Sequence, residues 1–89
     1  MKAKSTMLHA DSLDELKSEV MRARTKFPDN ALLFTALVEE VGELAKAYLQ
    51  RESMGRIEKE ALQIACVAMR IYEESDPTYD NVTDDQAKP

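Results

Sequence analysis

Apolar residues recur at intervals of three and four along three long stretches of this chain, and only short breaks separate the stretches. That spacing gathers apolar side chains on one face of an α-helix, whereas a half-buried strand alternates every second residue. The spacing predicts helices over residues 13–27, 31–51 and 57–75. Pro28 and Pro77 follow the first and third helices, where a proline is expected to end a helix. The sequence therefore predicts an all-α fold.

The ends of these helices also carry signals. Ser12 followed by Glu15 predicts a capping box at the start of the first helix. Residues 28–30 are expected to end that helix and to cap the next, and residues 52–55 form a short break. We expect residues 1–11 to be a flexible N-terminal segment and residues 12–75 to be the helical domain. Residues 76–89 hold four Asp and one Lys, which indicates a solvated acidic tail.

Charge and composition exclude several classes of partner. The net charge is −5, which opposes the phosphate contacts that general nucleic-acid binders and anionic-membrane binders need. The longest apolar run has six residues, at 64–69, whereas a transmembrane helix needs about 18 or more. Cys66 is the single cysteine, so an intrachain disulfide is excluded. We therefore expect a cytoplasmic protein that binds neither nucleic acid nor membrane.

Two glutamates fall where apolar residues are expected. On a helical wheel of the second helix, Glu40 lies within the apolar arc and Glu43 lies at its edge. The third helix repeats this arrangement, with Glu60 inside the arc and Gln63 at its boundary. Burying an ionised carboxylate is costly unless a counter-charge compensates it. Both helices therefore need a source of positive charge at the same kind of position.

That positive charge has two possible sources. If the second and third helices form an antiparallel hairpin, Glu40 and Glu60 face one another, and a hard divalent cation such as Mg²⁺ relieves their repulsion. The alternative is a set of structural ion pairs. In that case a Lys or Arg of the first helix pairs with Glu40, and Arg22 or Arg24 pairs with Glu60.

Other side chains are assigned to the core or to solvent by the same wheel. The apolar face of the third helix is predicted to comprise Ile57, Ala61, Ile64, Ala68, Ile71 and Tyr72. Its solvent side is predicted to comprise Lys59, Arg70 and Glu74. Phe27, Phe34 and Cys66 are expected to be core residues. Three wide apolar arcs exceed what so short a chain can bury alone, which predicts at least a homodimer.

Residues 37–45, L-V-E-E-V-G-E-L-A, resemble the first signature of the MazG-like all-α nucleoside triphosphate pyrophosphohydrolases. That signature is a Glu-x-x-Glu, commonly within E-E-x-G-E-L, and a Glu-x-x-Asp follows it on the next helix. Here residues 60–63, E-A-L-Q, take the second place, and the likeness covers residues 27–75. The resemblance implies a helical bundle completed by homo-oligomerisation, as a homodimer or a dimer of dimers.

The resemblance also implies an activity, the hydrolysis of a nucleoside or deoxynucleoside triphosphate to the monophosphate and pyrophosphate. It implies that Glu40, Glu43 and Glu60 are catalytic and, with Gln63, hold Mg²⁺ or Mn²⁺. Gln63 departs from the family pattern, because its amide oxygen can coordinate a cation but brings no negative charge. The alternatives are therefore a weakened or non-enzymatic nucleotide- or metal-binding relative, and a helical oligomerisation protein.

Cations near these acids are candidates for binding the substrate phosphates. They are Lys46, Arg51, Lys59 and Arg70. The alternative for each is an ordinary solvated surface charge.

Overall fold

The structure is a computed structural model that describes residues 8–74, and within that range it contains three helices and no strand. They are α1 (Ala10–Lys26), α2 (Leu33–Leu49) and α3 (Met54–Glu74). The prediction of an all-α fold is confirmed. The predicted tail 76–89 and most of the predicted N-terminal segment lie outside the described residues. No helix in the described range is both long and apolar enough to cross a membrane.

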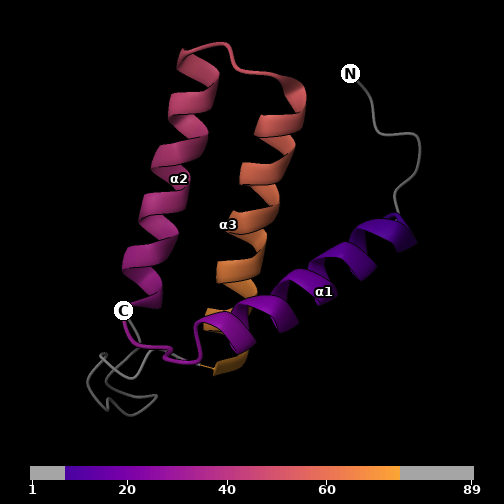
Figure 1. Cartoon of the computed structure of the whole chain (residues 1–89), viewed down its shortest axis with the longest axis vertical. Helices are drawn as coiled ribbons and strands as arrows, with labels where there is room; N and C mark the ends of the chain where they lie inside the picture. Colours follow the sequence, from indigo (N-terminus) through magenta and orange to yellow (C-terminus); the bar gives the residue numbers. More distant parts are fainter. Residues whose placement is uncertain (1–7, 75–89) are drawn as a thin grey trace, which may run out of the picture.

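The helices α2 and α3 form an antiparallel hairpin, and α1 crosses the C-terminal half of α3 (Figure 1). Within residues 8–74, α1 packs on α3 and does not pack on α2. The N-terminal half of α1 projects away from the hairpin (Figure 1). This arrangement brings the predicted acids of α2 and α3 onto facing helices, as the hairpin interpretation requires.

The start of α1 differs from the prediction. The backbone N–H groups of Ser12 and Leu13 both donate to the carbonyl of His9, at 3.1 and 3.3 Å. The helix therefore begins at Ala10, and its N-cap, His9, makes no side-chain hydrogen bond. Ser12 lies inside the helix, so the predicted capping box is wrong. Likewise Leu32, and none of residues 28–30, precedes α2 as its N-cap.

The turn from α2 to α3 has the predicted length of four residues but lies two residues earlier, at residues 50–53 instead of 52–55. The Glu52 N–H donates to the Ala47 carbonyl and the Arg51 N–H donates to the Tyr48 carbonyl, which together form a Schellman motif. Arg51 takes the left-handed conformation that this motif requires, with φ of 53°. The Ser53 hydroxyl then accepts the Arg56 N–H at 3.2 Å and caps α3. As a result α3 begins at Met54, three residues earlier than predicted.

The buried side of α3 is rotated from the predicted one. Arg70, predicted to face solvent, is 4% exposed, whereas Tyr72, predicted to be apolar core, is 83% exposed. Ala61 and Ala68 are exposed as well. The reason is that α3 packs against α2 on one side and α1 on another, so its buried arc must span both neighbours. A helical wheel of α3 alone does not indicate where the second neighbour will sit.

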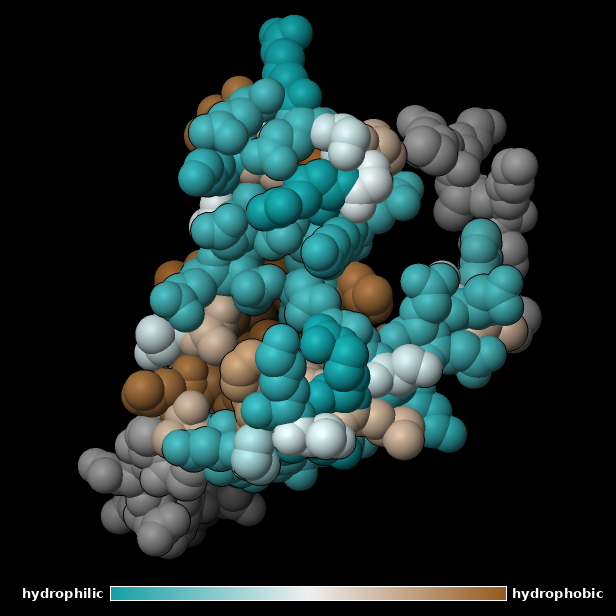
Figure 2. Space-filling model, in the orientation of Figure 1, coloured by the Kyte–Doolittle hydropathy of each residue, from teal (hydrophilic) through white to brown (hydrophobic). Residues whose placement is uncertain are grey.

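The core of a single chain is small. The buried apolar side chains of the described range are Val20, Leu33, Ala47 and Cys66. Phe27 and Phe34 were expected in the core, but both are exposed. An apolar stripe on α2 also faces solvent, and we call this the α2 stripe; it comprises Phe34, Val38, Val41 and Tyr48. Figure 2 shows hydrophobic residues along the α2 edge of the molecule.

We expect the α2 stripe to mediate self-association, because an exposed apolar row of this kind is unusual on a monomer. Val38→Lys places a charge at its centre and should raise the dissociation constant of the dimer at least about 30-fold. Gln50→Lys, an exposed position at the end of α2, is the control and should leave assembly unchanged. Sedimentation velocity measures both variants, and a wild-type monomer at tens of micromolar would contradict the prediction.

Candidate functional site

Three carboxylates gather where α2 and α3 face each other, and we call Glu40, Glu43 and Glu60 the acidic cluster. Glu60 is 6% exposed, which agrees with its predicted place inside the apolar arc of α3. Glu40 is half-buried on α2. Glu43, one turn further along α2, is exposed. The cluster therefore runs from the helix–helix interface outward to solvent.

The counter-charge of Glu60 is Arg56, one turn earlier on the same helix. A guanidinium nitrogen of Arg56 lies 3.3 Å from the Glu60 carboxylate, and another lies 3.8 Å from Glu43. Glu52 also lies 3.8 Å from the same guanidinium. Sequence reasoning missed Arg56 and named Arg22 and Arg24 instead. The available signal was the spacing of four between Arg56 and Glu60, which places them on one helix face.

Arg56 does not remove all of the electrostatic cost. The pKa of Glu40 is raised above its usual value, first by burial and then by the neighbouring carboxylates of Glu60 and Glu43. Glu39 adds to this effect, and Arg56 opposes it. The ionised form of Glu40 is therefore under-compensated, so a further positive charge at this point would stabilise it.

The chemistry of the acidic cluster suits Mg²⁺, which prefers carboxylate oxygens. A deficit of positive charge at Glu40 points the same way. The present positions of the side chains are not those of a closed ion site, since no three His, Cys, Asp or Glu side chains within residues 8–74 are arranged to hold a metal. An ion would therefore require the flexible side chains of the cluster to turn toward it.

A cleft adjoins the acidic cluster, with a volume of about 520 Å³. That volume lies in the range of small-molecule sites. Three of the predicted site residues line it, namely Glu40, Gln63 and Arg70. The end of α1, the segment before α2 and the first half of α2 supply other lining residues, which include Arg22, Phe27, Leu32 and Glu39. Glu40 therefore belongs both to the acidic cluster and to the cleft.

Gln63 is engaged with α1. Its side-chain amide donates to the Glu19 carboxylate at 2.5 Å. The Arg22 guanidinium also donates to Glu19, and these two hydrogen bonds, Arg22 first, lower the pKa of Glu19 to about 2. An Asp at position 63 would face Glu19 with like charge. Gln63 thus ties α3 to α1 at the edge of the cleft, and its predicted role as a metal ligand stays a prediction.

Arg70 is the buried cation of the cleft, and an acid on its own helix holds it. Its guanidinium donates to both carboxylate oxygens of Glu74, at 2.9 and 3.0 Å. Arg24 of α1 donates to Glu74 at 2.6 Å and to Glu73 at 2.6 Å. Arg70 and then Arg24 lower the pKa of Glu74 through these bonds. The network joins α1 to the end of α3 and fixes the position of Arg70, which lines the cleft.

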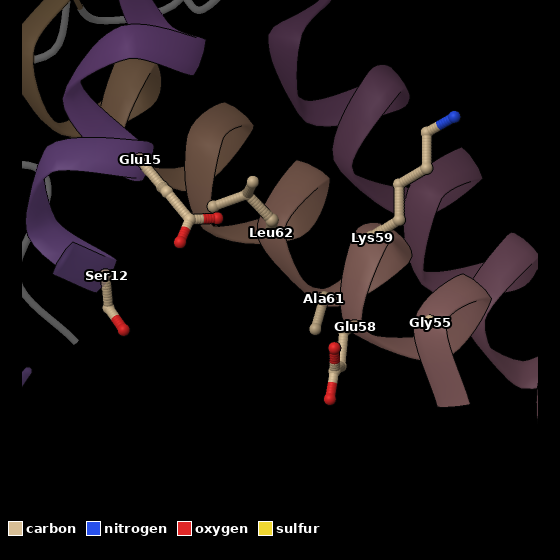
Figure 3. Close-up of a pocket in the computed structure, with 7 residues that line it drawn as sticks. All are labelled: Ser12, Glu15, Gly55, Glu58, Lys59, Ala61 and Leu62. Atoms are coloured by element: carbon tan, nitrogen blue, oxygen red, sulfur yellow. The ribbon is translucent and has the colours of Figure 1, made fainter.

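The other predicted phosphate contacts lie away from this cleft. Lys59 lines a separate hollow of about 660 Å³ between the first halves of α1 and α3. Figure 3 shows its side chain pointing away from Ser12 and Glu15, which line the same hollow. Lys46 is an exposed residue in the last turn of α2, and Arg51 is exposed in the turn that follows. Of the four predicted phosphate contacts, only Arg70 lines the same cleft as Glu40 and Gln63.

The rim of the cleft holds a strained residue. Leu32 has φ of 63° and ψ of 27°, the left-handed region, which costs a non-glycine residue about 1 kcal/mol or more. Its side chain is exposed rather than packed. Just before it, the Asp29 carboxylate accepts the Ala31 N–H at 2.9 Å and shapes the turn. Strain of this kind is common at binding sites, where it positions lining groups.

Comparisons of the chain with protein-family models, with curated proteins and with solved structures found no match. The resemblance to the MazG-like enzymes therefore rests on residues 37–45 and 60–63 of the sequence.

Glu74→Ala should destabilise the fold by about 2–3 kcal/mol, because it leaves Arg70 buried without its carboxylate. Glu73→Ala is the matched control and should cost less than about 1 kcal/mol, because Glu73 is exposed and its partner Arg24 is partly exposed. Urea unfolding measures both. Since folding lowers the pKa of Glu74, its contribution is complete above pH 4.5, the usual value, and is lost as the pH falls through the folded value. Equal losses in the two variants at pH 7 would contradict this role.

Glu40→Gln should stabilise the metal-free protein at pH 7 by about 1 kcal/mol, since it removes a charge that burial and neighbouring acids disfavour. Glu58→Gln, at an exposed position of α3, should change stability by less than about 0.5 kcal/mol. Thermal unfolding in the presence of a chelator compares the two. Destabilisation by Glu40→Gln would mean that another group already compensates the charge of Glu40.

Proposed function

We propose that this protein is a Mg²⁺-dependent nucleoside triphosphate pyrophosphohydrolase, which converts a nucleoside or deoxynucleoside triphosphate into the monophosphate and pyrophosphate. One observation carries the proposal: Glu60 is buried on α3, and burial together with the neighbouring carboxylates of Glu60 and Glu43 raises the pKa of Glu40 on α2. Buried carboxylates of this kind destabilise a protein unless a cation compensates their negative charge. The motif of residues 39–44 supports the same reaction class.

In this proposal the acidic cluster binds the ion and the adjoining cleft binds the nucleotide. Mg²⁺ would neutralise triphosphate charge and activate a water molecule. A carboxylate of the cluster accepts the proton of that water as its oxygen bonds to phosphorus, and the anhydride bond to the leaving pyrophosphate breaks. Arg70 and Arg22 supply positive charge along the cleft, and the exposed ring of Phe27 offers a face for a base.

A second candidate is a non-catalytic nucleotide- or metal-binding relative. Gln63 favours it, because the residue in the place of the family's Asp carries no charge and its amide is bonded to Glu19. A site with three carboxylates binds a cation less strongly than one with four. The two candidates differ in turnover and agree in ligand binding, so one set of measurements distinguishes them.

The decisive experiment measures pyrophosphate release from a panel of ribo- and deoxyribonucleoside triphosphates with Mg²⁺ or Mn²⁺. Phosphorus NMR of the products separates pyrophosphate from successive release of phosphate. Glu40→Gln and Glu60→Gln should each lower turnover at least about 100-fold, because each removes a ligand charge. Glu58→Gln is the control and should retain wild-type turnover, and circular dichroism confirms that all three variants fold.

The absence of pyrophosphate release from every triphosphate would contradict the enzymatic proposal. In that case, a rise in melting temperature with Mg²⁺ plus nucleotide would establish the second candidate, since a ligand that binds the native state stabilises it. If the protein shows no turnover and no thermal shift, the helical oligomerisation protein is the interpretation that remains.

A further inference from the structure

An uncharged surface runs along the length of α2, opposite the buried residues Leu33 and Ala47. We call it the uncharged face; it comprises the α2 stripe together with the exposed Thr35, Gly42, Ala45 and Leu49. On a helical wheel these eight residues form one arc of about 140°. Positions 34, 38, 41, 45 and 48 within it alternate spacings of four and three, which is the seven-residue repeat by which one helix packs along another. The uncharged face therefore fits a helix.

Gly42 lies halfway along the uncharged face, and no contact within residues 8–74 requires a glycine there. A Cβ added to Gly42 would meet no described atom within 4 Å. Its φ is negative, so the backbone conformation does not require a glycine either. Glycine is less favourable than alanine inside a helix, so this position gives up helix stability. A missing side chain does allow a second backbone to approach closely, and the distance between packed helices depends on the side chains at their contact.

We propose that α2 pairs in antiparallel direction with α2 of a second copy of the chain, and that the two helices cross at Gly42. A two-fold axis perpendicular to α2 then passes next to Gly42 and relates the copies. Counted from this axis, Thr35 lies level with the partner's Leu49, and Lys46 lies level with the partner's Val38. This inference does not rest on the proposed function, because it concerns the opposite side of α2 from the acidic cluster.

The distribution of charge on α2 favours a second copy as the occupant. The uncharged face has no acid or base among its eight residues, so two copies of it meet without electrostatic repulsion or desolvation of a charge. The exposed Glu39 and Lys46 border the face along one edge. In an antiparallel pair the two charged edges lie on the same side, and Lys46 comes within one residue of the level of the partner's Glu39.

The same edge favours the antiparallel direction over the parallel one. In a parallel pair the two charged edges lie on opposite sides of the seam and cannot meet. Opposite charges at the rim of an interface contribute little affinity, but they select direction and register. Antiparallel helices also align their dipoles favourably.

The uncharged face has about the area that a dimer interface needs. Five of its side chains are between 49% and 84% exposed, namely Phe34, Val38, Val41, Tyr48 and Leu49. Together they expose about 600 Å² of surface, since a large apolar side chain offers about 150–250 Å². A standard interface buries about 800 Å² on each partner. The exposed Thr35, Gly42 and Ala45 lie in the same arc and supply much of the remainder.

Gly42→Leu tests the crossing point. Leucine enlarges the apolar surface, so association through apolar surface alone would become tighter, whereas a close crossing at Gly42 has no room for the added side chain. The dissociation constant of the dimer, measured by sedimentation velocity, should therefore rise at least about 100-fold. Gly55→Leu is the matched control. Gly55 is the other glycine of the chain and is exposed in the first turn of α3, so the dissociation constant should stay within about twofold of wild type.

The fold of each variant is measured separately. Diluted to a concentration at which the protein is monomeric, Gly42→Leu should keep the helix content of wild type in circular dichroism, because leucine favours a helix more than glycine does. Gly42→Ala is the milder variant and should raise the dissociation constant about tenfold. A wild-type protein that stays monomeric at tens of micromolar would overturn the proposal. An unchanged or lower dissociation constant for folded Gly42→Leu would also overturn it, because the copies would then pair through another surface.

Cysteine cross-linking tests the direction, in a Cys66→Ala background that removes the native thiol. Thr35→Cys and Leu49→Cys chains should form a disulfide with each other when mixed and oxidised, and neither should form one with itself. Intact mass distinguishes the mixed product from the symmetric products. Glu58→Cys, exposed on α3, is the control and should form a disulfide with neither chain. Symmetric disulfides of Thr35→Cys and of Leu49→Cys would indicate a parallel pair and would overturn the proposal.

Discussion

The repulsion between carboxylates on α2 and α3 is the constraint on which the remaining interpretation depends. Glu60 is buried on α3, and burial together with the neighbouring carboxylates of Glu60 and Glu43 raises the pKa of Glu40 on α2. A chain selected for stability alone would place apolar residues at both positions. Because these two acids lie between packed helices, the packing of the hairpin requires a cation nearby. That cation is either a residue of the chain or an ion from solvent.

The surroundings of the acids are built to hold them in place rather than to neutralise them. Arg70, Glu74 and Arg24 fasten α1 to the far end of α3, and Gln63 bonds to Glu19 at the edge of the cleft. These contacts position one wall of the cleft while leaving Glu40 facing into it. The cations of the network are paired with their own acids, whereas Arg56 pairs with Glu60 and Glu43 of the acidic cluster. The exposed α2 stripe favours self-association, because the core of a single chain is small and the stripe leaves apolar side chains in solvent.

The sequence predicts the fold class and the helix count because the apolar spacing is local information. It also predicts that Glu60 is inward, since that position follows from the same wheel. The wheel fails for Arg70 and Tyr72, because burial on α3 depends on where α1 crosses it, and no local pattern encodes that crossing. The prediction that Phe27 and Phe34 are core residues is wrong for a related reason, since three helices of this length leave part of each apolar arc uncovered. Arg56 was missed because the search for a counter-charge looked to another helix instead of one turn back on the same helix.

The most direct measurement of the central claim is a titration of the isotopically labelled protein with Mn²⁺, followed by NMR. A paramagnetic ion broadens the signals of the amides nearest to it, so its position is mapped without any assumption about activity. The account predicts that substoichiometric Mn²⁺ broadens the amides around Glu40 and Glu60 first, and that excess Mg²⁺ reverses the broadening. Broadening centred on another part of the chain, or none at all, would contradict the claim that these facing acids hold a divalent cation.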